Sequence, residues 1–413
     1  MDLELVTIGT ELLLGFTVDT NSAFLGQALA GAGVRITRRT SVPDEPAAVA
    51  AAVSEALARS RLVITTGGLG PTKDDLSKTV VAELFGLPLE FHQEIWDAIV
   101  ARFARMGRKL SDRNRCQAEV PRGATVLPNP RGTAPGLWIS GAPGEVIMLP
   151  GVPGEMRGLV SNEVVPRLAA RSGGTVVRSH VLRTTGIAES MLAERLEPVE
   201  DSLAPLTLAY LPSLEGVDLR LTVWNAEPDR ADALLAEAAA RLQQPIAEHV
   251  YGTGQQDLAE VVLARFRERQ WTLAVAESCT GGMLGTRITA IPGSSGVFRG
   301  GLIAYHDELK RDLGVPARIL EQHGAVSEET VREMALAARR KYGATTALAI
   351  SGIAGPDGGS SEKPVGTVWI AHADAAGSEA HRAVFPGSRQ EIRIRATQAA
   401  LWRLWRRARA ATL

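Results

Sequence analysis

Short apolar runs alternate with segments of helical periodicity over most of the chain. Residues 3–8, 61–66 and 146–149 have the length and composition of buried strands, and residues 21–32 and 76–85 space their apolar side chains as helices do. Strands that alternate with helices are typical of α/β folds. The pattern therefore predicts a three-layer α/β domain in the N-terminal part of the chain.

Two breaks in this pattern divide the chain into three parts. Residues 171–174, Arg-Ser-Gly-Gly, are typical of a linker, and residues 251–254, Tyr-Gly-Thr-Gly, form a second break. Between the breaks we expect a small α+β module, with strands at 176–184 and 219–223 and helices at 187–196 and 230–242. After them an α/β pattern resumes, with helices at 257–269 and about 390–410 and a strand at 272–276. The predicted domains span residues 1–170, 175–250 and 255–413.

Composition narrows the class of protein. Hydrophobic residues make up 45% of the 413 residues, the formal net charge is −1, and no apolar run approaches the ~20 residues of a membrane span. The first residues include acidic side chains, whereas a secretory signal peptide begins with basic ones. Two cysteines, Cys116 and Cys279, form neither a disulfide framework nor a multi-cysteine zinc site. We expect a cytoplasmic homodimer that binds no membrane, and a net charge near zero gives no reason to expect nucleic acid.

A strand, a tight turn and a helix surround the strongest chemical motif, Ala276-Glu277-Ser278-Cys279-Thr280-Gly281-Gly282. Such a turn exposes a hydroxyl beside the amides at the start of the next helix. These amides suit an oxyanion next to a nucleophile, and they suit a bound phosphate equally well. The alternative is that Ser278 or Thr280 merely caps the helix.

Two further strand ends favour the chemical interpretation. Tyr305 and Lys310 follow a strand-like run at 302–305, and only six of the 45 basic residues are lysines, which can act as bases when desolvated. Residues 351–359 form a glycine-rich loop after another strand. In an open α/β sheet such ends gather on one edge, where ligands bind. We therefore expect Ser278, Tyr305 and Lys310 to meet at that edge.

This part of the chain resembles the CinA C-terminal, or nicotinamide mononucleotide (NMN) deamidase, family. The resemblance rests on residues 276–282, Pro292-Gly293-Ser294-Ser295, His323-Gly324-Ala325-Val326-Ser327, residues 351–359 and Lys363-Pro364-Val365-Gly366-Thr367-Val368, and it spans most of residues 257–413. It implies an α/β amidohydrolase domain that converts NMN to nicotinate mononucleotide and ammonia without a cofactor.

The resemblance also assigns residues. The family's nucleophile falls on Ser278, and its lysine and tyrosine fall on Lys310 and Tyr305. The expected substrate-binding residues are Thr280, Gly281, Gly282, Ser351, Gly352, Gly355 and Arg389, the last as a phosphate ligand. Asp307 replaces the asparagine expected in Tyr-x-Asn-x-x-Lys, and an acid there favours the charged form of Lys310. Cys279 is the rival nucleophile, but adjacent residues on the turn point in different directions, so we favour Ser278.

Glycine loops also mark the N-terminal part, beside Asp74 and Asp75. They suggest a phosphate site with hard oxygen ligands for a divalent cation, unless one of the two acids caps the helix at 76–85. Residues 8–15, 67–75 and 129–136 resemble the MoaB/MogA-like molybdopterin-binding domain of CinA proteins. The resemblance implies metal-dependent cleavage of ADP-ribose, with a site formed by Gly67, Gly68, Gly70, Asp74, Asp75, Gly132 and Thr133. The implied metal ligands are Glu11, Asp74 and Asp75.

Two other functions remain open. The first is a binding module for a molybdopterin precursor, and the second is an interaction protein of competence or DNA damage without turnover. A scaffold has no need of a hydroxyl, a tyrosine and a lysine at converging strand ends, so the sequence favours a nucleotide hydrolase that acts on NMN and ADP-ribose.

Overall fold

The structure is a computed structural model that describes residues 1–410. By internal contacts the chain divides into two compact units, one made of residues 1–178 and 223–234 and the other of residues 179–222 and 235–413. Each is a mixed α/β structure, as the apolar pattern predicts. Among residues 1–410, every helix is too short or too polar to traverse a lipid bilayer.

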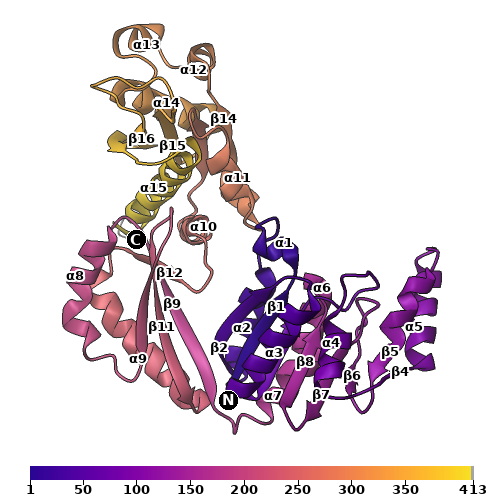
Figure 1. Ribbon diagram of the computed structural model, residues 1–413. Coiled ribbons are helices and arrows are strands. Elements are labelled where there is room, and N and C mark those ends of the chain that lie inside the picture. Colours follow the sequence, from indigo (N-terminus) through magenta and orange to yellow (C-terminus); the bar gives the residue numbers. More distant parts are fainter. Residues whose placement is uncertain (411–413) are drawn as a thin grey trace. The chain divides into compact units, whose positions relative to one another are not determined.

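The first unit is built on a six-stranded sheet of order β2-β1-β3-β8-β7-β6 (Figure 1). Strands β1, β2, β3 and β8 are parallel, and β7 runs antiparallel to both of its neighbours, β8 and β6. The strands are β1 (Asp2–Ile8), β2 (Arg35–Val42), β3 (Leu62–Thr66), β6 (Thr125–Leu127), β7 (Gly136–Gly141) and β8 (Gly144–Leu149). The chain passes from β1 to β2 on one side and returns to β3 on the other. The sheet therefore has its topological switch point between β1 and β3, where open α/β sheets bind ligands.

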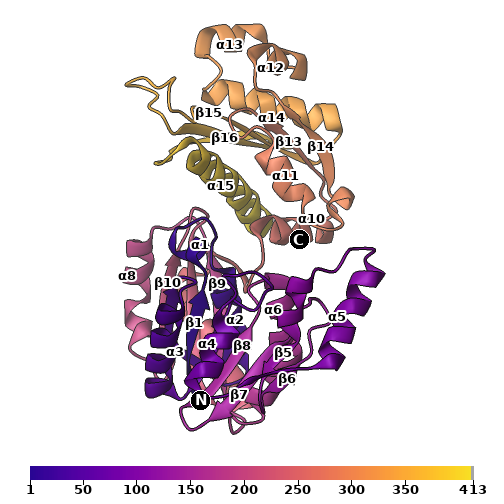
Figure 2. The same ribbon diagram turned by 45° about the vertical axis from the view of Figure 1, so that its right-hand side comes forward.

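Helices cover both faces of this sheet. They are α2 (Thr20–Gly31), α3 (Pro46–Ser60), α4 (Ser77–Leu84), α6 (Pro153–Leu159) and α7 (Val165–Ala169), whereas the short helix α1 (Thr10–Leu13) that follows β1 buries no residue. Leu3 and Leu5 pack in one buried cluster with α2, α6 and α7, whereas Val6 and Ile8 pack in another with α3 and α4. Helix α5 (Gln93–Arg105) lies beside a small sheet of β4 (Leu89–Phe91) and β5 (Glu119–Pro121) (Figure 2).

Helices α2 and α4 differ in how they begin. Asp19 caps α2, because its carboxylate accepts the Ser22 amide at 2.9 Å. Neither Asp74 nor Asp75 caps α4. The N-cap position is occupied by Leu76, and no side chain caps this helix.

The middle part forms an antiparallel sheet of order β10-β11-β9-β12. Its elements are β9 (Val176–Thr184), α8 (Glu189–Glu200), β10 (Thr207–Pro212), β11 (Val217–Ala226), α9 (Pro228–Ile246) and β12 (Val250–Thr253). The predicted break at 251–254 is therefore wrong for its first residues, since β12 pairs with β9 and buries Tyr251. Glycines in such a short segment suggested a linker, but only the long-range pairing makes it a strand.

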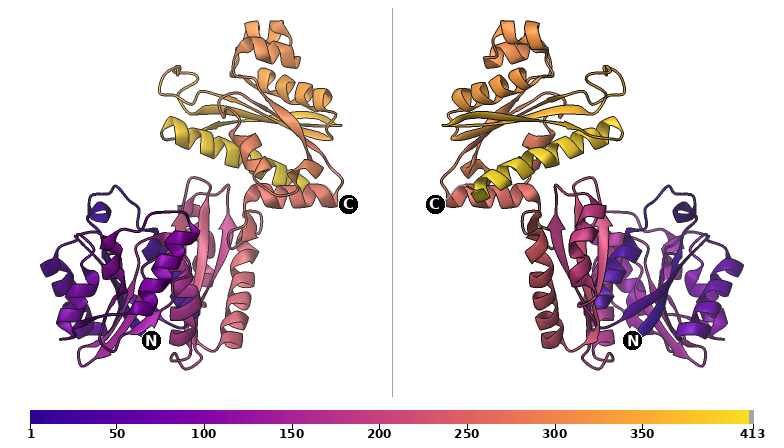
Figure 3. Two further views of the ribbon diagram at one scale, coloured as in Figure 1. Left: turned by 90° about the vertical axis from the view of Figure 1, so that its right-hand side faces the viewer. Right: turned by 90° about the vertical axis from the view of Figure 1, so that its left-hand side faces the viewer.

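The C-terminal part is a five-stranded sheet of order β14-β13-β15-β16-β17, covered by α14 on one face and by α10 and α15 on the other (Figure 3). The strands are β13 (Leu273–Glu277), β14 (Phe298–Ile303), β15 (Thr346–Gly352), β16 (Thr367–Asp374) and β17 (Gly377–Val384). The helices are α10 (Leu258–Glu268), α11 (Met283–Thr289), α12 (Asp307–Leu313), α13 (Ala317–His323), α14 (Glu328–Tyr342) and α15 (Arg389–Ala410). β13, β14 and β15 are parallel, and the switch point falls between β13 and β15.

Candidate functional site

A cavity of about 200 Å³ lies at the carboxyl ends of β13 and β15. Its lining residues come from five separate segments of the C-terminal part: Ser278, Cys279, Tyr305, Asp307, Lys310, Ala325, Val326, Ser351, Gly352, Ala354 and Arg389. The fold thus brings together Ser278, Tyr305, Lys310, Ser351, Gly352 and Arg389, as the sequence predicts for converging strand ends.

Ser278 is the first residue after β13. Its amide donates to the Ile350 carbonyl of β15 at 2.9 Å, which ties the turn to the neighbouring strand. The residue is 8% exposed, and among residues 1–410 its hydroxyl makes no side-chain hydrogen bond. Ser278 therefore presents an unengaged hydroxyl to the cavity from a turn whose position is fixed.

Glu277 holds the other side of this turn, a role that the sequence did not suggest. Its buried carboxylate accepts hydrogen bonds from the amides of Gly282 at 3.1 Å, Leu284 at 3.1 Å and Gly285 at 2.8 Å. The helix start expected to bind an anion is thus occupied by a side chain of the protein. The sequence feature that could have indicated this role of Glu277 is an acidic residue at the end of an otherwise apolar strand.

The expected binding role of Thr280, Gly281 and Gly282 needs correction, because none of them lines the cavity. The Gly281 amide donates to the Ser278 carbonyl, and Thr280 is fully buried. Among residues 1–410 no other residue accepts a hydrogen bond from the amide of Cys279, and Cys279 lines the cavity. The available oxyanion donor is therefore the amide that directly follows Ser278.

Lys310 is almost completely buried, with 1% exposure. Its ammonium donates to the Asp307 carboxylate at 3.2 Å and to the Tyr305 carbonyl at 3.3 Å. Because a lysine ammonium has three donors, one remains for a ligand in the cavity. Asp307, the residue that departs from the family pattern, is the direct ion-pair partner of Lys310.

Arg389, the first residue of α15, connects two other segments of the site. Its guanidinium donates to the Gly355 carbonyl at 2.8 Å and to the Tyr305 hydroxyl at 2.7 Å. Gly355 lies outside the lining, so it acts through this bond and not by the expected direct contact. Arg389 and Tyr305 are both exposed, and their polar groups are accessible to a substrate.

Ser351 closes the site from β15. Its buried hydroxyl donates to the Ala325 carbonyl at 2.6 Å, which fixes the segment that carries Ala325 and Val326. These two residues lie in a string that supports the family resemblance, but the sequence gave them no role in the site.

Cys279 borders the cavity, but its side chain is packed in the apolar core. It is 5% exposed within the apolar cluster below the sheet, and burial raises the pKa of its thiol to about 12. A thiol reacts as its thiolate, which is scarce several pH units below the pKa. We expect iodoacetamide at pH 7.5 to leave Cys279 unmodified in the folded protein and to modify it after unfolding in urea. Peptide mass spectrometry measures this, and rapid native labelling of Cys279 would contradict the assignment.

A second cavity, of about 360 Å³, lies at the switch point of the N-terminal sheet. Of the predicted residues, its lining includes Glu11, Gly67, Gly68, Gly70, Asp74, Asp75 and Thr133. Asp44, Gln117 and Glu155 join them without having been predicted. Gly132 instead lines a neighbouring cavity that shares Thr133.

The glycine loop of this cavity is held by Ser77, whose hydroxyl donates to the Gly67 carbonyl at 2.8 Å. Gly68 has φ +70°, and a Cβ there would meet the Ser77 hydroxyl oxygen at 2.0 Å, so only glycine fits. Among residues 1–410 the amides of Gly68 and Leu69 have no hydrogen-bond partner. Free amides on a fixed loop suit an anionic ligand.

The structure does not bring Glu11, Asp74 and Asp75 together as a metal centre. Within residues 1–410 no group of three His, Cys, Asp or Glu side chains is placed to hold a metal ion. Asp75 is turned into its own loop, where it accepts the Gly70 amide at 2.6 Å and the Thr72 amide at 2.8 Å. The loop therefore uses one of the three expected ligands to maintain its own shape.

Comparisons with known proteins agree with this organisation. Three family models match: "Probable molybdopterin binding domain" over residues 4–170, "Damage-inducible protein CinA KH domain" over 179–252, and "CinA C-terminal domain" over 255–408.

Similar proteins extend over nearly the full chain. A CinA-like protein of Gemmatimonas aurantiaca is 51% identical over 411 residues, which cover 98% of this chain and 96% of that protein. One of Parasynechococcus marenigrum is 47% identical and covers 91% of this chain and 90% of its own length. The crystal structure of the competence/damage inducible protein CihA from Agrobacterium tumefaciens is 40% identical over 35% of this chain and 89% of its own, with a TM-score of 0.34. Shared identity over almost the whole length places this chain in the CinA family.

Proposed function

We propose that the C-terminal part hydrolyses the carboxamide of NMN, giving nicotinate mononucleotide and ammonia. One observation carries the proposal: a single cavity collects a free hydroxyl on Ser278, the buried ammonium of Lys310 and the accessible guanidinium of Arg389. Membership of the CinA family is consistent with a hydrolase.

In the proposed first half-reaction, the Ser278 oxygen bonds to the carboxamide carbon, and the carbon–nitrogen bond breaks to release ammonia. The hydroxyl proton passes to the departing nitrogen through Lys310, after Lys310 has given up a proton. Asp307 pairs with the Lys310 ammonium before this step, and because the Asp307 side chain is half exposed, the proton that Lys310 loses can pass to solvent. In the second half-reaction water attacks the ester, restores the Ser278 hydroxyl and leaves the acid.

The remaining contacts position the substrate. The Cys279 amide supports the oxyanion that forms on the carbonyl oxygen. Arg389, held by Gly355 and Tyr305, is suited to the phosphate of the nucleotide, because a guanidinium binds phosphate through charge-assisted hydrogen bonds.

The direct test is ammonia release from NMN by the purified full chain, with and without EDTA. We expect release at the same rate in both conditions, because the C-terminal cavity is lined by hydroxyl, lysine, arginine and backbone groups and one carboxylate. Loss of activity in EDTA would contradict a metal-independent deamidase, and no release in either condition would exclude NMN as the substrate.

For the N-terminal cavity we propose cleavage of the pyrophosphate of ADP-ribose. Its free amides at Gly68 and Leu69 suit phosphate oxygens. Asp74 also lines the cavity and does not accept the Gly70 and Thr72 amides that engage Asp75, although it contacts the Thr72 side chain. Magnesium sites often use only one or two carboxylates, with water and substrate phosphates as the other ligands. A dependence on divalent cations is therefore compatible with the lack of a preformed cage.

Asp74→Asn and EDTA should each reduce ADP-ribose cleavage by at least ~10²-fold while leaving NMN deamidation unchanged, since the two activities belong to different cavities. Chromatographic separation of the phosphate-bearing products measures ADP-ribose cleavage, and ammonia release measures NMN deamidation. If EDTA abolished deamidation and spared ADP-ribose cleavage, the two chemistries would be assigned to the wrong parts.

The part of the chain that matches the CinA KH domain, residues 179–252, gives no reason to propose that the protein binds nucleic acid. KH domains clamp the nucleic-acid backbone with a Gly-x-x-Gly loop. Between residues 179 and 252 no two glycines are three positions apart.

A further inference from the structure

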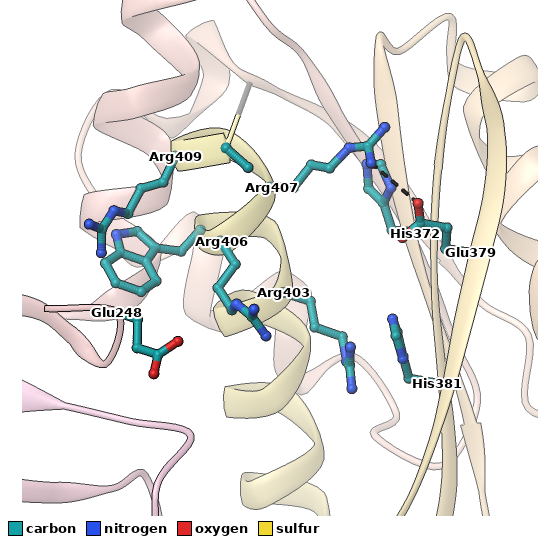
Figure 4. Close-up of a pocket in the computed structure, with 10 residues that line it drawn as sticks. Glu248, His372, Glu379, His381, Arg403, Arg406, Arg407 and Arg409 are labelled. Carbon is teal, nitrogen blue, oxygen red and sulfur yellow. Dashed lines mark hydrogen bonds and ion pairs between the residues drawn. The ribbon is translucent and has the colours of Figure 1, made fainter. Parts of the chain in front are cut away.

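A second charged cavity lies on the C-terminal part, away from Ser278. Its volume is about 560 Å³, within the range of small-molecule sites. Figure 4 shows arginines of α15 on one side and the histidines of β16 and β17 on the other, with Glu248 at the margin. The charged and titratable lining residues are Arg403, Arg406, Arg407, Arg409, His372, His381, Glu248 and Glu379.

The arginines share a face of the helix because of their spacing. Arg406 and Arg407 are three and four residues after Arg403, and like charges at this spacing repel one another. Arginines in a last helical turn also stabilise the helix dipole, which alone would explain an exposed basic face. That explanation does not cover Arg403, which is half-buried with a buried Nε that has no hydrogen-bond partner among residues 1–410. Buried donors are normally paired, so this one indicates a missing acceptor.

Three of the four guanidinium groups already have partners, and the Cζ atom of Arg406 lies over the Trp402 ring, 5.0 Å from its centroid. Arg407 is paired with Asp374 and with Glu379, the latter at 3.3 Å, and Arg409 donates to the Ala247 carbonyl at 2.7 Å. Arg403 and Arg406 have no ion pair among residues 1–410. Burial and the charge of Arg403 lower the pKa of His381, so this ring is neutral near pH 7 and can donate one N–H.

We propose that this cavity binds a small phosphate-bearing anion between Arg403, Arg406 and His381. The anion supplies the acceptor that Arg403 Nε lacks and offsets the repulsion between the two arginines. The proposal is independent of the deamidase, since none of these residues lines the Ser278 cavity.

Pyrophosphate is a suitable probe, and the local readout is the ring ¹⁵N–¹H spectrum of histidine-labelled full chain. The protein has seven histidines, and His372→Gln and His381→Gln assign the two relevant signals. We expect pyrophosphate to shift both signals in the wild type. In Arg403→Gln the apparent affinity should fall roughly 10- to 100-fold, the usual effect of losing a charged hydrogen bond.

Arg265→Gln is the matched control, because Arg265 lies on α10, outside this cavity, in an exposed pair with Glu268. It should bind pyrophosphate as the wild type does, and thermal melting checks that both variants are folded. The proposal fails if pyrophosphate does not shift the two histidine signals. This holds even if calorimetry detects binding, because the pyrophosphate would then bind elsewhere in the chain. It fails also if Arg403→Gln binds normally, or if only a single-stranded oligonucleotide shifts these signals.

Discussion

Ser278→Ala should reduce ammonia release from NMN by at least ~10⁴-fold, the largest effect of any single substitution in this chain. The substitution removes the only cavity-facing hydroxyl on the β13 turn and leaves the turn intact. The Ser278 amide still bonds to Ile350, and Glu277 still accepts its three amides. A loss of rate therefore reports on the hydroxyl and not on a collapsed turn.

Cys279→Ala is the matched control, since it alters the adjacent side chain and retains the proposed oxyanion amide. We expect its rate to stay within a few-fold of the wild type, with a modest loss of stability because a packed core side chain is shortened. If Ser278→Ala kept its activity and Cys279→Ala lost it, the nucleophile would be the cysteine.

Lys310→Met should reduce deamidation by about 10²–10⁴-fold, the usual contribution of a proton-transfer group. Methionine has a similar length and no proton to transfer, and the site of Lys310 is almost fully buried. Lys310→Arg should be nearly as inactive, because a guanidinium keeps the charge but does not release a proton in proteins. Initial rates at saturating NMN, together with melting curves, measure both variants.

Asp307→Asn distinguishes the effect of the negative charge of Asp307 from the effect of its hydrogen bond with Lys310. Asparagine can still accept from Lys310, but it no longer stabilises the ammonium, so Lys310 gives up its proton more readily. We expect this variant to keep or raise the rate near pH 7, whereas both Lys310 variants lose it. Full activity in Lys310→Arg would show that Lys310 only supplies positive charge.

The pattern of residues in the sequence is sufficient to predict the strand, turn and helix around Ser278. The apolar run before Ser278 predicts β13, the glycines after it predict a turn, and α11 is the helix expected after that turn. The terminal helix begins within one residue of its predicted start. These features depend on neighbours within a few positions, which the pattern of apolar residues and glycines records directly.

Only the tertiary structure decided which groups remain free to act. Glu277 fills the helix start that the sequence offered to a ligand, and Asp75 is held by its own loop and not by a metal. Arg389 reaches Tyr305 from a position 84 residues further along the chain, and the strand β12 exists only through its pairing with β9. A polar group forms hydrogen bonds with whichever partner the fold brings near it. The spacing of residues along the sequence does not predict such contacts between distant segments.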